Sequence, residues 1–300
     1  MSAVYRSVFE PGFFSSAPVH TALVVGGLIA VVSAVVGVFT VIRGQSFGGH
    51  ALTDVSTAGG SGALLVGMSP LAGFVAGGVL GAGVMETIGT HKARGRDLAT
   101  GIVLGGATGL AALFLYLDTT SGATTGATQQ ILFGSIFIID TSTIPYVVGL
   151  AALALVLIGA LYRPLLLSSV SAEIAAARGI PVRRVGMLYM GALAVSVGLS
   201  SLAIGTILST ALLIGPAATA LRLTTRVGRA VVLASVIGVA ATWVGTLLSY
   251  DSYYWGSSHN GWPVSFFIVA IVFVTYLLSR FSVVRRRSKP SRALLPRVAR

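Results

Sequence analysis

The chain has 300 residues, of which 55% are hydrophobic and only 9% are charged. A soluble domain carries about 25% charged residues, whereas apolar segments long enough to cross a bilayer recur here from end to end. The composition excludes a soluble globular protein and predicts an all-α, polytopic helical membrane bundle. The chain has no cysteine, which excludes a disulfide framework and a thiolate metal site.

The formal net charge of +12 does not indicate a nucleic-acid partner, because Lys and Arg beside apolar spans usually set membrane orientation. Nine spans put the two termini on opposite sides of the membrane. Arg6 alone then falls on the N-terminal side, and the other nineteen Lys and Arg residues fall on the opposite side. The asymmetry predicts a multi-pass plasma-membrane protein with its N-terminus outside and its C-terminus in the cytoplasm.

The first half of the chain begins with a predicted extracellular segment, 1–18, before a membrane domain over 19–282. The predicted spans of this half cover about 21–42, 46–67, 70–89 and 98–117. A loop rich in Thr and Gly follows over 118–130. The apolar stretch 131–139 is too short to cross and predicts a re-entrant half-helix.

The second half begins with a predicted fifth span over 144–161. The apolar block 185–221 is long enough for two spans, with a turn expected near Ser200 and Ser201. An eighth span reaches about Tyr250 and a ninth ends near Phe281, before a basic cytoplasmic tail over 283–300. An eight-span count stays possible, but it breaks the charge asymmetry unless the block 185–221 is divided differently.

Glycines recur every four residues in the third and fourth predicted spans. This spacing lets helix backbones approach closely in lipid. The two sets are Gly73, Gly77, Gly81 and Gly101, Gly105, Gly109.

A polar segment, 168–181, predicts a short helix between two spans on the cytoplasmic side. Ser171 is a good N-cap, and Glu173 suits the positive end of the helix dipole. Gly179 can adopt the left-handed conformation that ends a helix, and Pro181 prevents its resumption. Such a helix can dock a soluble partner; the alternative is an ordinary interfacial loop helix.

Three ionisable residues fall inside predicted spans, where each costs a few kcal/mol or more in lipid. His50 and Asp54 are four residues apart and share a helix face, and Glu86 falls at a similar depth on the next span. Imidazole and carboxylates together are ligands for Zn, Mn or Fe(II). The alternatives are a His–Asp pair that braces two helices and a Glu86 that reaches the interface.

The residues argue against two hypotheses, an ATP-binding site on this chain and an intramembrane protease. The only lysines, Lys92 and Lys289, do not follow a glycine-rich phosphate loop, so any ATP and Mg must bind a partner chain. The run 59–62 fits the G-x-S-G motif of rhomboid intramembrane proteases. Ser61 and His50 would lie on one helix about 16 Å apart, far beyond hydrogen-bond reach, so the chain is predicted to be no enzyme and to bind no cofactor.

Five segments together resemble the permease subunit of ABC importers for zinc, manganese and iron, the ABC-3 type. They are GVFTVIRGQSFGGHA (37–51), DLATGIV (97–103), LFGSI (132–136), SAEIAAARGIP (171–181) and GTILSTALLIGPAATA (205–220). Their order and spacing match the family over most of the chain.

The resemblance implies a homodimeric or pseudo-dimeric permease in the lipid bilayer, a pair of cytoplasmic ATPase subunits and an extracellular metal-binding protein. It implies that the ATPase grips a coupling helix, and it makes His50 the family histidine of the metal path. The coupling residues would be Ser171, Glu173, Ala177, Arg178 and Gly179.

The chain departs from the family around His50. The family commonly has an acid four residues before the histidine, where this chain has Ser46, and Pro-Gly where it has Asp54 and Val55. Two other hypotheses therefore stay open: a permease for a metal chelate such as a siderophore, and a proton-coupled secondary transporter that uses Asp54 and Glu86.

Overall fold

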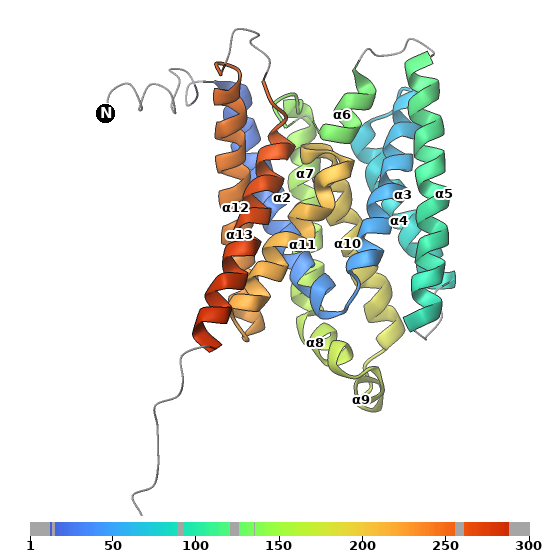
Figure 1. The fold of residues 1–300 in the computed structure, drawn as a ribbon. Coiled ribbons are helices and arrows are strands. Elements are labelled where there is room, and N and C mark those ends of the chain that lie inside the picture. Colours follow the sequence, from blue (N-terminus) through green and yellow to red (C-terminus); the bar gives the residue numbers. More distant parts are fainter. Residues whose placement is uncertain are drawn as a thin grey trace, which may run out of the picture.

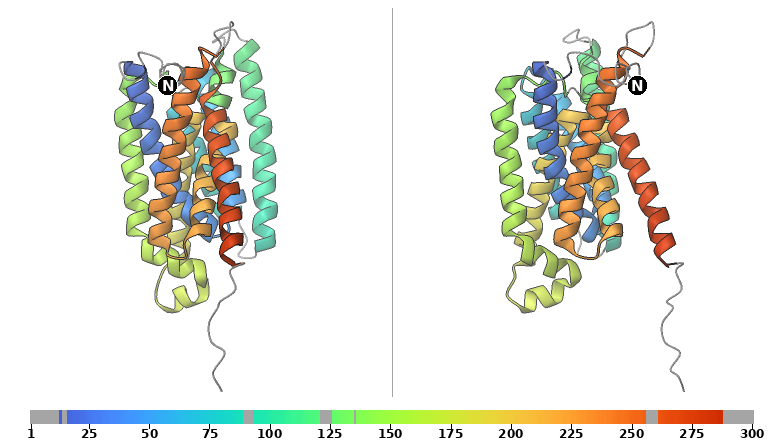
Figure 2. Two further views of the ribbon diagram at one scale, coloured as in Figure 1. Left: turned by 60° about the vertical axis from the view of Figure 1, so that its left-hand side comes forward. Right: turned by 90° about the vertical axis from the view of Figure 1, so that its left-hand side faces the viewer.

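The computed structural model describes residues 13, 16–88, 93–120, 126–134, 136–255 and 261–287. Over these residues the chain forms a bundle of long helices that run side by side, with short helices at its two ends (Figures 1 and 2). The helices of membrane length are α2 (Ala17–Ile42), α3 (Ser46–Leu65), α4 (Pro70–Ile88), α5 (Ala93–Thr120), α7 (Ile144–Ala160), α10 (Val182–Ile204), α11 (Thr206–Leu223), α12 (Val227–Ser252) and α13 (Val264–Arg287). The predicted all-α membrane bundle is confirmed. The predicted terminal segments lie mostly outside the described residues.

Whether the chain has eight or nine membrane spans depends on whether α3 is counted as one. Eight helices of the described chain are both long and apolar enough to cross a membrane, and α3 is not among them. Its 20 residues span about 30 Å, the thickness of the hydrocarbon core. The polar side chains of α3 explain its low hydropathy, and most are enclosed by protein: Thr53, Ser56, Thr57 and Ser61 are all buried.

The short elements lie at the two ends of the bundle (Figure 1). One end carries α6 (Ala127–Phe133), and this is the α6 end. The opposite end, the α9 end, carries α8 (Tyr162–Val170) and α9 (Ala172–Ala177), which project below the long helices. A 3-10 turn, η2 (Thr141–Thr143), leads into α7.

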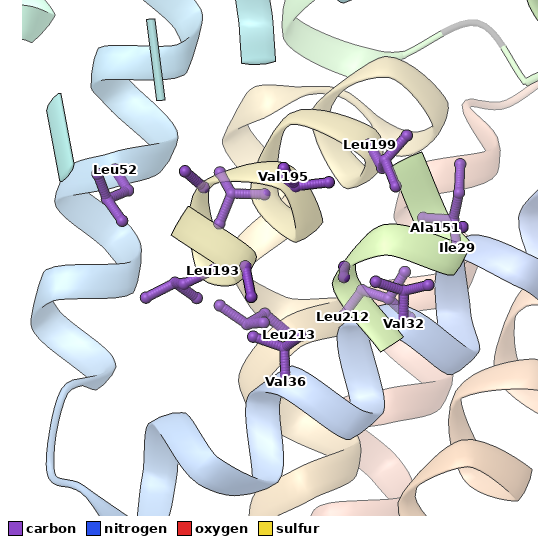
Figure 3. Packing of buried hydrophobic residues seen from close by; sticks show 14 of the residues in the cluster. Ile29, Val32, Val36, Leu52, Ala151, Leu193, Val195, Leu199, Leu212 and Leu213 are labelled. Carbon is purple, nitrogen blue, oxygen red and sulfur yellow. The ribbon is translucent and has the colours of Figure 1, made fainter. Parts of the chain in front are cut away.

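The core lies where α2, α10 and α11 meet, as Figure 3 shows. Small and branched apolar side chains interdigitate there, which suits close packing of helices in lipid. Fully buried members include Ile29, Val32 and Val36 of α2, Leu193 and Leu199 of α10, and Leu212 and Leu213 of α11.

The two glycine sets behave differently. A methyl group at Gly77 of α4 would lie 2.9 Å from both the Gly59 Cα and the Val55 carbonyl oxygen of α3. The close approach predicted for that set is therefore confirmed. In contrast, Gly105 and Gly109 of α5 face open space.

Two predicted boundaries were wrong. The turn expected at Ser200 and Ser201 lies instead at Gly205, whose φ is +81°. Ser200 stays helical because its hydroxyl donates to the Ser196 carbonyl and shares a 2.6 Å hydrogen bond with Ser33 on α2. The half-helix expected over 131–139 is α6, which ends at Phe133 because Gly134 has a φ of +82°.

Candidate functional site: a polar face on α3 and a projecting helix pair

His50 lies on an exposed face of α3, one turn after the helix begins. Its Nδ1 lies 3.2 Å from the hydroxyl oxygen of Thr210 on α11, within hydrogen-bond distance. The Thr210 hydroxyl also lies 3.3 Å from that of Thr53 on α3. The imidazole is therefore oriented by a neighbouring span while part of the ring stays accessible.

Asp54 follows one turn later on the same helix and is half-buried. It accepts a 2.6 Å hydrogen bond from the Thr108 hydroxyl of α5. Asp54 is thus hydrogen-bonded to α5, whereas His50 is hydrogen-bonded to α11.

Glu86 lies near the end of α4 and lines a cavity of about 790 Å³ at the α9 end. Arg43 borders the same cavity from the α2–α3 turn, and Glu173 and Arg183 border it from the α8–α10 side. Glu86 is therefore placed at an opening of the bundle.

The described part of the chain holds no group of three or more His, Asp and Glu side chains positioned to bind one metal ion. His50 lies beside Thr210 of α11, Asp54 beside Thr108 of α5, and Glu86 on the wall of the cavity. The structure instead arranges them as separate polar positions, two on α3 and one at the α9 end.

The exposure of His50 has a consequence in a membrane. A polar side chain that faces lipid costs several kcal/mol, so polar residues of spans usually face protein or water. Phe47 and His50 are exposed on α3, and Asp54, one turn further on, is half-exposed. That face must be covered by another chain or line an aqueous path.

The helix predicted within 168–181 is confirmed as α9. The Ser171 hydroxyl accepts a 3.2 Å hydrogen bond from the Ile174 N–H, and Gly179 has a φ of +77°. Ala175 is fully buried, which anchors the helix. In contrast, Val170 is 84% exposed and Ile174 is 51% exposed, so the projecting pair presents apolar surface.

Ser61, the serine of the protease-like motif, is buried, and no histidine of the described residues is among its hydrogen-bond partners. Its hydroxyl donates to the backbone carbonyl of Thr57 at 2.8 Å. This is the usual way in which a serine is satisfied inside a span.

The carboxylates near the α6 end differ in their surroundings. Asp140 is exposed, and its pKa lies below the usual range because the Ser142 N–H donates to it. In contrast, Asp118 and Asp251 are buried within α5 and α12.

Several residues around the site carry no local sequence signal. Thr108 and Thr210 lie 54 and 160 positions away from their partners on α3. A threonine inside an apolar span is ordinarily satisfied by its own helix. Only the packing of α3 between α5 and α11 reveals their roles.

Comparisons with a family model and with known proteins identify the same family. Residues 16–287 match the model of the ABC 3 transport family. The manganese transport system membrane protein MntC of Halalkalibacterium halodurans is 31% identical over 232 residues, which covers 77% of this chain and 78% of that protein. The manganese import system permease protein ScaB of Streptococcus parasanguinis is 27% identical over 234 residues, which covers 77% of this chain and 81% of that protein.

Solved structures share the fold. PsaBC from Streptococcus pneumoniae, in complex with Fab, superposes with a TM-score of 0.79 at 25% identity, over 96% of this chain and 98% of that one. A metal-chelate type ABC transporter in an inward-facing conformation gives a TM-score of 0.67 at 16% identity, over 88% and 85% of the two chains, and shows the fold alone. This chain is a multi-pass membrane protein that belongs to the ABC 3 transport family.

Proposed function

We propose that the chain is the permease subunit of an ATP-driven importer for divalent transition-metal ions, with Mn²⁺ as the first cargo to test and Zn²⁺ and Fe²⁺ next. The names of the MntC and ScaB relatives support manganese. The single observation that carries the proposal is the accessible imidazole of His50 on a membrane-length helix, one turn from Asp54. Imidazole and carboxylate ligands suit this group of metals.

In this proposal His50 and Asp54 are successive transient ligands on one path, and Glu86 lies at its exit. A permease must release its cargo, so a few separated ligands serve better than a closed site with several. The separation of the three side chains among different neighbours is consistent with that requirement.

The projecting pair α8–α9 is the proposed contact with the ATPase subunits. Ser171 and Gly179 shape the ends of α9, while Glu173, Ala177 and Arg178 lie exposed on it. The exposed Val170 and Ile174 side chains offer apolar surface for burial. Exposed apolar patches of this kind mark protein contacts. ATP and Mg would bind the partner chains, because this sequence lacks a phosphate loop.

A second copy of the chain is the proposed cover for the open face of α3. Exposing the polar residues of that face to lipid costs free energy. Gly105 and Gly109 on the neighbouring α5 leave room for another helix to approach closely. A homodimer would enclose His50 between two bundles.

The α6 end is the proposed docking site of an extracellular metal-binding protein. A cavity of about 670 Å³ opens there, between α6 and the start of α13. It is lined by the half-exposed aromatic side chains Tyr253, Tyr254 and Trp262. The arginines of the described helices cluster near the α9 end, which supports a cytoplasmic position for that end and an N-terminus outside.

The test is transport by the reconstituted complex. The permease, its ATPase and the metal-loaded binding protein are placed in liposomes that contain a metal-sensitive dye. The proposal predicts Mn²⁺ entry that requires ATP. Entry driven by a proton gradient without ATP would establish the secondary transporter, and entry of a ferric siderophore but no free ion would establish the chelate permease.

A further inference from the structure

The turn between α2 and α3 contains a residue that joins the projecting helices to the start of α3. Arg43 follows α2 directly, and α3 begins three residues later at Ser46. The turn is joined to both helices by backbone hydrogen bonds at Gln45: its N–H donates to the Thr40 carbonyl of α2, and its carbonyl accepts from the Gly49 N–H of α3, both 2.9 Å. A displacement of Arg43 would therefore move the first turn of α3.

Arg43 reaches the projecting helices through a side-chain hydrogen bond. Its Nη1 donates to the Ser168 hydroxyl of α8 at 3.0 Å. The Ser168 hydroxyl donates in turn to the Leu165 carbonyl, at 3.1 Å, and Leu165 is fully buried. The bond is thus anchored in the body of α8.

Arg43 is also held from the bundle side. Its guanidinium lies 5.0 Å from the ring centroid of Tyr189 on α10, a cation–π contact. Tyr189 is fully buried, and its hydroxyl donates to Thr40 of α2 at 2.8 Å. The guanidinium is therefore oriented toward Ser168 rather than free to rotate.

Open space surrounds this contact. The α2–α3 turn, the end of α4 and the helices α8 and α9 all border the cavity of about 790 Å³, and Arg43 and Ser168 both lie on its wall. Side chains that border a cavity can shift without displacing a packed core. The Arg43–Ser168 hydrogen bond thus joins the α2–α3 turn to α8 at the edge of this cavity.

We propose that Arg43 is a positioning residue that transmits movement of α8–α9 to α3 through its hydrogen bond with Ser168. This inference rests on the proposed function, in which an ATPase moves α8–α9 and His50 lies on the cargo path. His50 is four residues from the start of α3, about 6 Å along the helix. A shift at Arg43 therefore reaches the cargo ligand within one helical turn.

The first test measures cargo moved per ATP hydrolysed in the reconstituted complex. Ser168→Ala and Arg43→Gln each remove the hydrogen bond. Each is expected to lower the amount of cargo moved per ATP about tenfold, because a charge-assisted hydrogen bond is lost. Basal ATP hydrolysis and assembly with the ATPase should stay at the wild-type level. The double variant should be no worse than either single variant, because both remove the same interaction.

Matched controls lie close by. Ser169→Ala removes a hydroxyl that donates to the same Leu165 carbonyl, and Arg222→Gln removes another arginine from a tyrosine face, that of Tyr276. Neither control should change the ratio. An equal loss with Ser169→Ala, or a fall of ATP hydrolysis in step with transport, would overturn the proposal.

A second test does not depend on the cargo. The chain has no native cysteine, so spin labels can be placed cleanly at Arg163→Cys on α8 and Phe47→Cys on α3, both exposed positions. The label distance should stay constant between the nucleotide-free and ATP-trapped complexes and should change in the Ser168→Ala background. A distance that changes equally in both backgrounds would overturn the link, even if the transported ion proved to be different.

Discussion

The Nδ1 atom of His50 on α3 lies 3.2 Å from the hydroxyl oxygen of Thr210 on α11. A hydrogen bond to one ring nitrogen fixes the orientation of a metal-binding imidazole and leaves the other nitrogen to the ion. The pairing makes Thr210 a residue that orients the proposed cargo ligand.

Replacing Thr210 by Val is therefore expected to weaken metal transport while the helix packing stays intact. Loss of a partner that orients a ligand typically lowers metal affinity about tenfold or more. The apparent KM for Mn²⁺ should rise by that factor, and Thr210→Ser should restore it. Thr219→Val, which removes a hydroxyl bonded to its own α11 backbone, serves as the control. Normal transport by Thr210→Val would show that His50 needs no partner on α11.

Asp54→Asn tests whether the Asp54 carboxylate serves the cargo or only braces α3 against α5. The amide oxygen can still accept the hydrogen bond from Thr108, so a brace should survive the change. A cargo ligand should not survive it, because the negative charge is lost. We expect the initial uptake rate at low Mn²⁺ concentration to fall about tenfold. Wild-type uptake by Asp54→Asn would assign a structural role to the carboxylate.

The exposed surface of α9 is tested by two substitutions on it. Glu173→Lys reverses a charge near the helix N-terminus, and Ile174→Asp removes half-exposed apolar surface. Both are expected to abolish co-purification with the ATPase while the permease still folds. Thr225→Lys, exposed in the α11–α12 connection, should leave co-purification unchanged. If Glu173→Lys and Ile174→Asp bind the ATPase normally, its docking site lies elsewhere.

The contact between α3 and α4 should be sensitive to a single methyl group. Gly77→Ala places a Cβ 2.9 Å from the Gly59 Cα, and overpacking of this kind costs about 1–3 kcal/mol. Thermal unfolding in detergent should therefore begin at a lower temperature. Gly83→Ala on the same helix faces open space and should be neutral or slightly stabilising. Equal melting temperatures for the two variants would contradict the packing described here.

Much of the fold follows from hydropathy alone, because lipid forces each apolar segment to satisfy its own backbone as a helix. The exceptions have local causes. Ser200 and Ser201 suggest a turn because they are small and polar, but Ser200 is satisfied inside the bundle by Ser33 and Ser196. The helix instead breaks at Gly205, which has a positive φ.

The candidate site is less predictable from the sequence. Periodicity places His50 and Asp54 on one face of α3, and the structure keeps them there. Their partners Thr210 and Thr108 depend on which spans flank α3, and spacing along the chain does not encode that. The Arg43–Ser168 hydrogen bond joins residues 125 positions apart, so it cannot be predicted from the sequence for the same reason.

The most direct measurement is ATP-dependent Mn²⁺ uptake by the complete transporter carrying wild-type permease or His50→Ala, with equal amounts of each in the membrane. His50 is an exposed side chain outside the hydrophobic core, so its truncation should leave folding and ATPase assembly unchanged. The proposed function predicts that uptake is lost while the ATPase still co-purifies. Uptake at the wild-type rate by His50→Ala would contradict a cargo path along α3.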